Sequence, residues 1–178
     1  MIRKIVPMLL CLTIASAWSG QRAIASTTGT SLSPNAFEVR LGAFFPSSSD
    51  ARFVGGQTQL SAGLSYTLSS TGGLTPSATN AYFDYMSGSK NSGYVHSGGF
   101  GLEFRTVGTG YVGAGLGLYN TSVKNAAGLT GSATGGGGKI FAGMNLGSGS
   151  SLQLDYHILP SSMGVNPSGV GLSIGFHL

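Results

Sequence analysis

Apolar and polar or small residues alternate along this chain, most clearly between residues 110 and 119. One face of that stretch carries Val112, Ala114, Leu116 and Leu118, and the other carries Tyr111, Gly113, Gly115, Gly117 and Tyr119. Period-two alternation is typical of a β-strand whose faces meet two environments. Glycine weakens a strand unless another group packs closely against it. A glycine face between tyrosines therefore indicates a crowded interior, with the Val/Ala/Leu face turned toward lipid.

The same alternation recurs often enough to build a complete barrel. The expected strands are 37–45, 59–68, 81–85, 94–105, 110–119, 139–146, 152–158 and 170–178. Their number is even, as bacterial single-chain barrels require, and most approach the 9–11 residues of a tilted membrane-crossing strand. The fold class predicted is all-β: an eight-stranded antiparallel transmembrane β-barrel over residues 37–178.

The connections divide into two groups if both ends of the barrel domain lie on the periplasmic side. The segments 46–56, 87–93, 121–137 and 159–168 would then be external loops. The segments 69–79, 106–109 and 147–150 would be periplasmic turns. Two of these turns are short, as expected, whereas the segment 69–79 is long for a periplasmic turn.

The first 25 residues have the features of a cleaved secretory signal peptide. Arg3 and Lys4 precede an apolar region at 5–18, and Ala23-Ile24-Ala25 offers a cleavage site after Ala25. A second site at Ala15-Ser16-Ala17 and a retained anchor helix are the alternatives. Residues 26–36, rich in Ser, Thr and Pro, are expected to form a flexible lead-in.

The chain has few charged residues, which is unusual for an ordinary soluble domain. Charged residues make up 8% of the chain, against about a quarter in ordinary soluble domains. Loss of Arg3, Lys4 and Arg22 with the signal peptide lowers the formal charge from +4 to +1. The mature chain would have no cysteine and no basic patch, so neither a disulfide nor nucleic-acid binding is predicted.

The chain resembles the small bacterial outer-membrane β-barrel family that includes the OmpA transmembrane domain, OmpW, OmpX and the opacity proteins. The segments 111–119, 152–156 and 170–178 carry this resemblance. It implies a location in the outer membrane of a Gram-negative-type bacterium, with outer-membrane lipid as a partner. It also implies that the barrel assembly machinery reads the last strand, through Val170, Leu172, Ile174, Phe176 and Leu178. Leu178 stands where the family usually ends in an aromatic residue.

Most charged side chains fall on the predicted inward face. They are Glu38, Arg40, Asp84, Glu103, Arg105, Lys139, Asp155 and His157. An interior of eight strands is just wide enough for side chains to fill it, and buried charges must be paired. We interpret these residues as two acid–base sets that form a lumen charge network, in which Lys139 and Asp155 are near enough to meet.

Three functions fit this pattern. The first is a barrel with a closed, side-chain-filled lumen and a structural or surface-interaction role through its external loops. The second is a narrow OmpW-like conduit for small apolar molecules, and the third is a soluble secreted β-sandwich or adhesin-like module.

No enzymatic activity, cofactor or metal is predicted. His96 and Ser97 are neighbours in one strand and point to opposite faces, and Asp155 with His157 fits an interior hydrogen-bonding role. The three histidines show no metal-ligand spacing, and the Gly135–Gly138 run lacks the lysine and Ser/Thr of a phosphate-binding loop.

Overall fold

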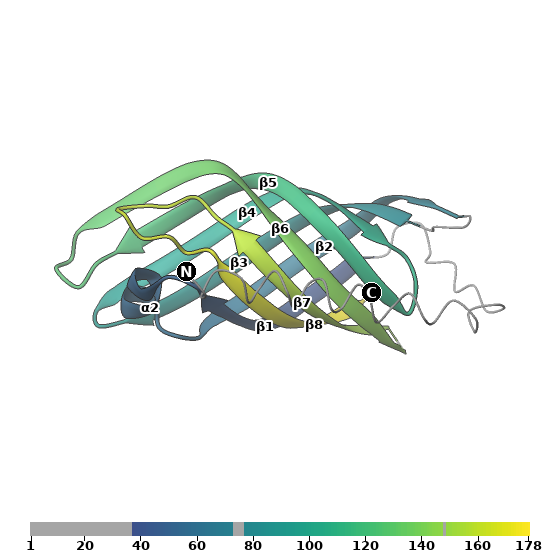
Figure 1. Ribbon diagram of the computed structural model, residues 1–178, viewed down its shortest axis with the longest axis horizontal. Coiled ribbons are helices and arrows are strands. Elements are labelled where there is room, and N and C mark those ends of the chain that lie inside the picture. The colour runs from purple at the N-terminus through teal and green to yellow at the C-terminus, as the bar shows by residue number, and fades with distance from the viewer. Residues whose placement is uncertain (1–36, 73–76, 148) are drawn as a thin grey trace, which may run out of the picture. The chain divides into compact units, whose positions relative to one another are not determined.

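The computed structural model describes residues 37–72, 77–147 and 149–178, and within these ranges the chain forms one closed antiparallel barrel (Figure 1). The predicted signal peptide and lead-in lie outside the described residues. The strands follow chain order around the barrel: β1 (Phe37–Pro46), β2 (Gln59–Thr71), β3 (Ser77–Lys90), β4 (Gly93–Thr106), β5 (Gly110–Lys124), β6 (Thr130–Gly147), β7 (Ser150–Ile158) and β8 (Gly169–His177). The eight-stranded fold is therefore confirmed. A β-sandwich is excluded because β1 pairs with both β2 and β8.

The strand register shows how strongly the barrel is staggered. A row of paired residues from Leu41 reaches Thr134 on β6 through β2–β5, and reaches Met144 on β6 through β8 and β7. The two arrivals are ten residues apart on the same strand. Such a stagger requires strands tilted by about 40° from the barrel axis. The strands of the near wall run obliquely in Figure 1.

The faces of all eight strands are as the alternation predicted. Inward side chains such as Glu38, Tyr82 and Tyr119 are buried, whereas outward Leu41, Phe100 and Leu116 are exposed. Outward apolar residues form a continuous band around the barrel. On β1 the band covers residues 37–45, which at 3.3 Å per residue and a tilt of about 40° is roughly 22 Å tall. That height is close to the ~25 Å apolar band of outer-membrane barrels.

Interior glycines lie beneath aromatic rings. A side chain on Gly143 would overlap the ring of Tyr111, and one on Gly113 would overlap Phe141. Gly115 leaves room for Tyr82, with the nearest ring carbon 3.0 Å from where a Cβ would stand. The glycine face of β5 is thus explained by rings that need the space.

The lengths of the strands differ from the prediction on the external side. The expected loop 121–137 is mostly strand, because β5 continues to Lys124 and β6 begins at Thr130. The expected loop 87–93 shrinks to a tight turn in which Asn91 and Ser92 have φ of 52° and 62°. Glycine and serine have weak strand propensity, but pairing with a neighbouring strand overrides it.

Two other connections also differ. The segment 69–79 is shorter than expected, because β2 extends to Thr71 and β3 begins at Ser77. The segment 46–56 contains a helix, α2 (Ser49–Gly55), whose first turn is capped by Ser48 accepting a hydrogen bond from the Ala51 amide at 3.1 Å. No helix among the described residues is long and apolar enough to cross a membrane.

We predict that Leu116→Arg will impair folding into lipid. Leu116 is 77% exposed in the middle of the apolar band, and arginine at the bilayer midplane costs about 2–4 kcal/mol in such barrels. The folded fraction in lipid vesicles, read as the gel shift between unboiled and boiled samples across a urea series, measures this change. Ser132→Arg, on the outward face above the band, is the matched control. Equal folding of the two variants would contradict the assignment of this face to lipid.

A second pair of variants tests the packing of rings over glycine. Gly143→Val should destabilise the barrel by about 1–3 kcal/mol, because the added side chain overlaps the ring of Tyr111. Gly136→Val should be nearly neutral, since no heavy atom lies within 4 Å of its outward position. Urea unfolding in vesicles compares them, and a cost at Gly136 as large as that at Gly143 would argue against the packing explanation.

Candidate functional site: the charge network of the barrel interior

The inward positions of five strands place charged side chains at neighbouring levels of the barrel. Glu38 and Arg40 come from β1, and Asp84 comes from β3. Glu103 and Arg105 come from β4, Lys139 from β6, and Asp155 and His157 from β7. All eight side chains are buried. The alternation along each strand turns these side chains inward. Closure of the sheet then brings side chains from different strands close together.

Lys139 and Arg40 are the centre of this network. The Lys139 Nζ lies 2.9 Å from Asp84 Oδ2 and 2.8 Å from Glu103 Oε2. The Arg40 guanidinium lies 3.4 Å from Asp84, 3.7 Å from Glu103 and 3.6 Å from Glu38. Arg40 and Lys139, which lie far apart in the sequence, therefore both contact the carboxylates of Asp84 and Glu103.

Glu38 extends the network toward the end of the barrel where β1 begins and β8 ends. Its Oε2 lies 3.2 Å from Arg105 Nη1, and its Oε1 accepts a hydrogen bond from Ser151 Oγ at 2.7 Å. Ser65 Oγ donates to the same carboxylate at 3.3 Å. Asn80 Nδ2 likewise donates to Glu103 at 3.0 Å. Sequence reasoning missed these polar partners, although each occupies an inward position of its strand.

Asp155 and His157 form a separate contact. His157 Nε2 lies 2.9 Å from Asp155 Oδ1. Lys139 and Asp155 were expected to be near enough to meet, but Lys139 pairs with Asp84 and Glu103 instead. The register explains this result: Lys139 is paired with His157, and Asp155 with Phe141. The first expected set, Glu38, Arg40, Glu103 and Arg105, is joined to Asp84 and Lys139 of the second, because Arg40 contacts Glu38, Glu103 and Asp84. Asp155 and His157, the other members of the second set, pair with each other.

Aromatic rings surround the cations. Lys139 Nζ lies 3.9 Å from the centre of the Tyr82 ring, and the Arg105 guanidinium carbon lies 5.1 Å from that of Tyr111. Cation–π attraction strengthens when the cation is removed from water. The rings that occupy the space over the glycines therefore also stabilise the interior charges.

An apolar layer lies between the charges and helix α2. It consists of Phe44, Tyr82, Met86, Tyr119 and Leu159. The hydroxyl of Tyr119 donates a hydrogen bond to that of Tyr82 at 3.0 Å, which leaves this layer without an unpaired phenol. His157 packs edge-on against Phe44, with ring centres 5.9 Å apart.

Helix α2 covers the mouth of the barrel that was predicted to be external. Its Ala51 and Val54 are buried with Val95 of β4, Val123 of β5 and Val165 of the β7–β8 connection. Asn91 in the β3–β4 turn donates a hydrogen bond to the Phe53 carbonyl at 3.1 Å. In Figure 1 the helix lies at the end of the barrel opposite the C-terminus. Seven helical residues are too few for a periodic signal, so sequence reasoning missed this cap.

Within the described residues no cluster of three or more His, Cys, Asp or Glu is positioned to hold a metal ion. Ser97 is buried inside the barrel and its neighbour His96 lies on the outer face. The Asp155–His157 pair is buried among rings.

Comparisons with solved structures match the barrel. Neisserial surface protein A (NspA), of Neisseria, is similar over 82% of this chain and 97% of its own, with 16% sequence identity and a TM-score of 0.51. Ail, the attachment invasion locus protein of Yersinia pestis, solved with the heparin analogue sucrose octasulfate, covers 81% of this chain and 97% of its own, with 9% identity and a TM-score of 0.46.

No protein-family model matches the chain. No curated protein matches it either. The structural likeness defines the class by fold: this chain has the fold of the small eight-stranded outer-membrane β-barrels.

We predict that Lys139→Met will destabilise the barrel by about 3–5 kcal/mol, because it leaves buried carboxylates with too little positive charge. Urea unfolding of the vesicle-inserted protein measures the change. The double variant Lys139→Met with Asp84→Asn restores the balance of charge and should recover much of the loss. Lys124→Met, at the external end of β5, is the control outside the network and should be nearly neutral. Equal stability of Lys139→Met and Lys124→Met would contradict the role assigned to the network.

Proposed function

We propose that this protein is a small barrel of the outer membrane of a Gram-negative-type bacterium, with a lumen closed by side chains. Its role is structural, or lies in surface interaction through its external loops. The observation that carries this proposal is the charge network, because Arg40 and Lys139 reach across the interior to share Asp84 and Glu103.

Three layers support a closed lumen. From the periplasmic end outward they are the charge network, the apolar layer around Tyr82 and Tyr119, and the valine cap beneath α2. A conduit would have to interrupt each of them. Apolar molecules in particular would have to pass a layer of paired charges, which is unfavourable because polar groups in that layer would lose their partners.

The external end favours a role in surface interaction. Three large apolar side chains are exposed there: Phe53 on α2 at 60%, Leu129 in the β5–β6 loop at 62%, and Met163 in the β7–β8 connection at 46%. Apolar groups exposed beyond a membrane-facing band are suited to a protein partner. The opposite end has short turns at β4–β5 and β6–β7.

The partners proposed are outer-membrane lipid around the apolar band and the barrel assembly machinery during biogenesis. The last strand supports the second partner, since Leu172, Ile174 and Phe176 lie exposed on its outward side and Leu178 is exposed directly after it. No enzymatic activity, cofactor or nucleic-acid partner is part of the proposal.

Permeability of reconstituted vesicles tests the closed lumen. Wild-type protein, shown to be folded by its heat-dependent gel shift, should leave an entrapped dye and a small entrapped sugar inside. The double variant Arg40→Ser with Glu103→Ser removes two crossing side chains of opposite charge and should release the smaller solute. Vesicles without protein give the baseline. Rapid release by folded wild type would contradict closure and favour the conduit.

A further inference from the structure

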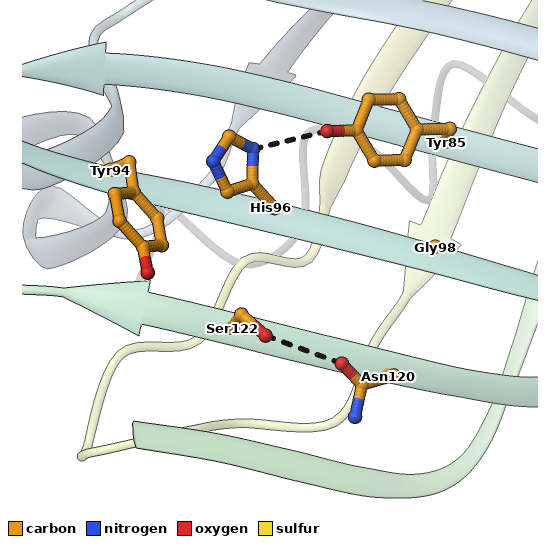
Figure 2. Close-up of a pocket in the computed structure, with 6 residues that line it drawn as sticks. All are labelled: Tyr85, Tyr94, His96, Gly98, Asn120 and Ser122. Carbon is orange, nitrogen blue, oxygen red and sulfur yellow. Dashed lines mark hydrogen bonds between the residues drawn. The ribbon is translucent and has the colours of Figure 1, made fainter. Parts of the chain in front are cut away.

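A shallow polar pocket lies on the outer wall of the barrel, away from the interior network. Its volume is about 380 Å³, and it is lined by Tyr85 of β3, Tyr94, His96 and Gly98 of β4, and Asn120 and Ser122 of β5. These are outward positions of their strands. Figure 2 shows the three strands side by side with the polar side chains above and below Gly98. The pocket is unusual because it places hydrogen-bonding groups on the lipid-facing side of the wall.

The strand register gives the level of this pocket. Tyr85, Gly98 and Asn120 share one row, and the next outward row toward the periplasm contains Phe83, Phe100 and Leu118. Those three side chains are exposed and belong to the apolar band. The pocket therefore begins where the band ends on β4 and β5, at the level where lipid headgroups meet acyl chains.

The histidine side of the pocket is held in place by two hydroxyls. His96 Nδ1 lies 2.7 Å from Ser87 Oγ and 3.2 Å from the Tyr85 hydroxyl. These bonds use one ring nitrogen, and Figure 2 shows the other on the side of the ring away from Tyr85. In the tautomer in which Nδ1 accepts from the nearer hydroxyl, that of Ser87, Nε2 carries the proton and is a donor for a ligand.

Aromatic faces form the second feature of the pocket. The Tyr94 ring is 4.5 Å from the His96 ring, centre to centre, and the Tyr85 ring is stacked at 6.2 Å with an angle of 12°. The face of an aromatic ring is negative and attracts positively polarised C–H groups. Sugar rings present such C–H groups on one face and hydroxyls around their edge.

The β5 side supplies neutral donors and acceptors. Ser122 Oγ donates to Asn120 Oδ1 at 3.3 Å, and the Asn120 amide donates to Thr134 of β6 at 2.8 Å. The amide oxygen of Asn120 and the Ser122 hydroxyl each keep lone pairs for a ligand. No lining residue carries a permanent charge, so the pocket is suited to hydroxyls more than to a bare phosphate.

We propose that this pocket binds the sugar headgroup of a glycolipid in the external leaflet, with the lipid's acyl chains lying along Phe83, Phe100 and Leu118. The inference rests on the proposed residence in the outer membrane. Contact between the apolar band and the pocket favours a lipid source of the sugar, because a single ligand can then occupy both surfaces. A free saccharide offers the same headgroup chemistry without the chains, and the experiment separates the two.

Native mass spectrometry of the folded protein released from detergent micelles counts the bound lipids. The probes are a diglucosamine lipid with acyl chains, a diacylglycerol with the same chains and no sugar, and the free diglucosamine. Wild type should retain the sugar lipid at least tenfold more strongly than the diacylglycerol. The free disaccharide should bind far more weakly than the sugar lipid, because it lacks the chains that contact the apolar band.

Two variants locate the binding. His96→Ala with Asn120→Ala should weaken retention of the sugar lipid about tenfold, since it removes two hydrogen-bonding groups. Thr79→Ala, on the outward face of β3 near the periplasmic end, should bind as wild type does. Unchanged retention by the double variant would overturn the proposal, as would equal retention of the diacylglycerol. Equal binding of the free disaccharide would assign the pocket to soluble saccharides instead.

The heat-dependent gel shift separates failure of this inference from failure of the proposed function. A wild type that shifts on heating but shows no preference for the sugar lipid would overturn only the pocket assignment. A wild type that shows no shift and stays out of membranes would overturn the proposed function together with the pocket's ligand.

Discussion

Closure of the sheet is the constraint on which the rest of this structure depends. In a bilayer every backbone N–H and C=O must be satisfied within the protein, and an eight-stranded sheet achieves this only when β1 pairs with β8. Closure at this strand number and stagger fixes a narrow interior. The interior then has to be filled by the chain's own side chains, and most features of the sequence reflect how it is filled.

The interior is filled by aromatic rings, glycines and charged side chains, and each of these three groups depends on the other two. Tyr82 occupies space left by Gly115 and lies 3.9 Å from the ammonium group of Lys139. Lys139 in turn neutralises Asp84 and Glu103, which also pair with Arg40. Removing one member would leave either a cavity or an unpaired buried charge. The same crowding supports a closed lumen, because the groups that stabilise the interior also occupy its cross-section.

The outer wall of the barrel has a simpler organisation, with an apolar band followed by a polar extension of the strands. A continuous apolar band ends sharply at the row above Phe100 and Leu118, and polar positions begin there on β4 and β5. Strands β3 to β6 continue past this border as a polar extension, while α2 closes the mouth beside them. The end that carries α2 thus carries both the cap and the exposed apolar residues, whereas the other end carries short turns.

The sequence by itself determined the faces of every strand, because alternation along one strand fixes which side chains share a surface. It also determined the strand number and the inward placement of the charged residues from Glu38 to His157. Only the tertiary structure decided which charges meet: Lys139 joins Asp84 and Glu103 across the barrel, and the register keeps it from Asp155. The helix α2, the extension of β5 to Lys124 and the start of β6 at Thr130 also depended on the tertiary structure. Short helices and glycine-rich strands are stabilised by residues that are distant in sequence and close in space, and a local sequence pattern does not show which residues these are.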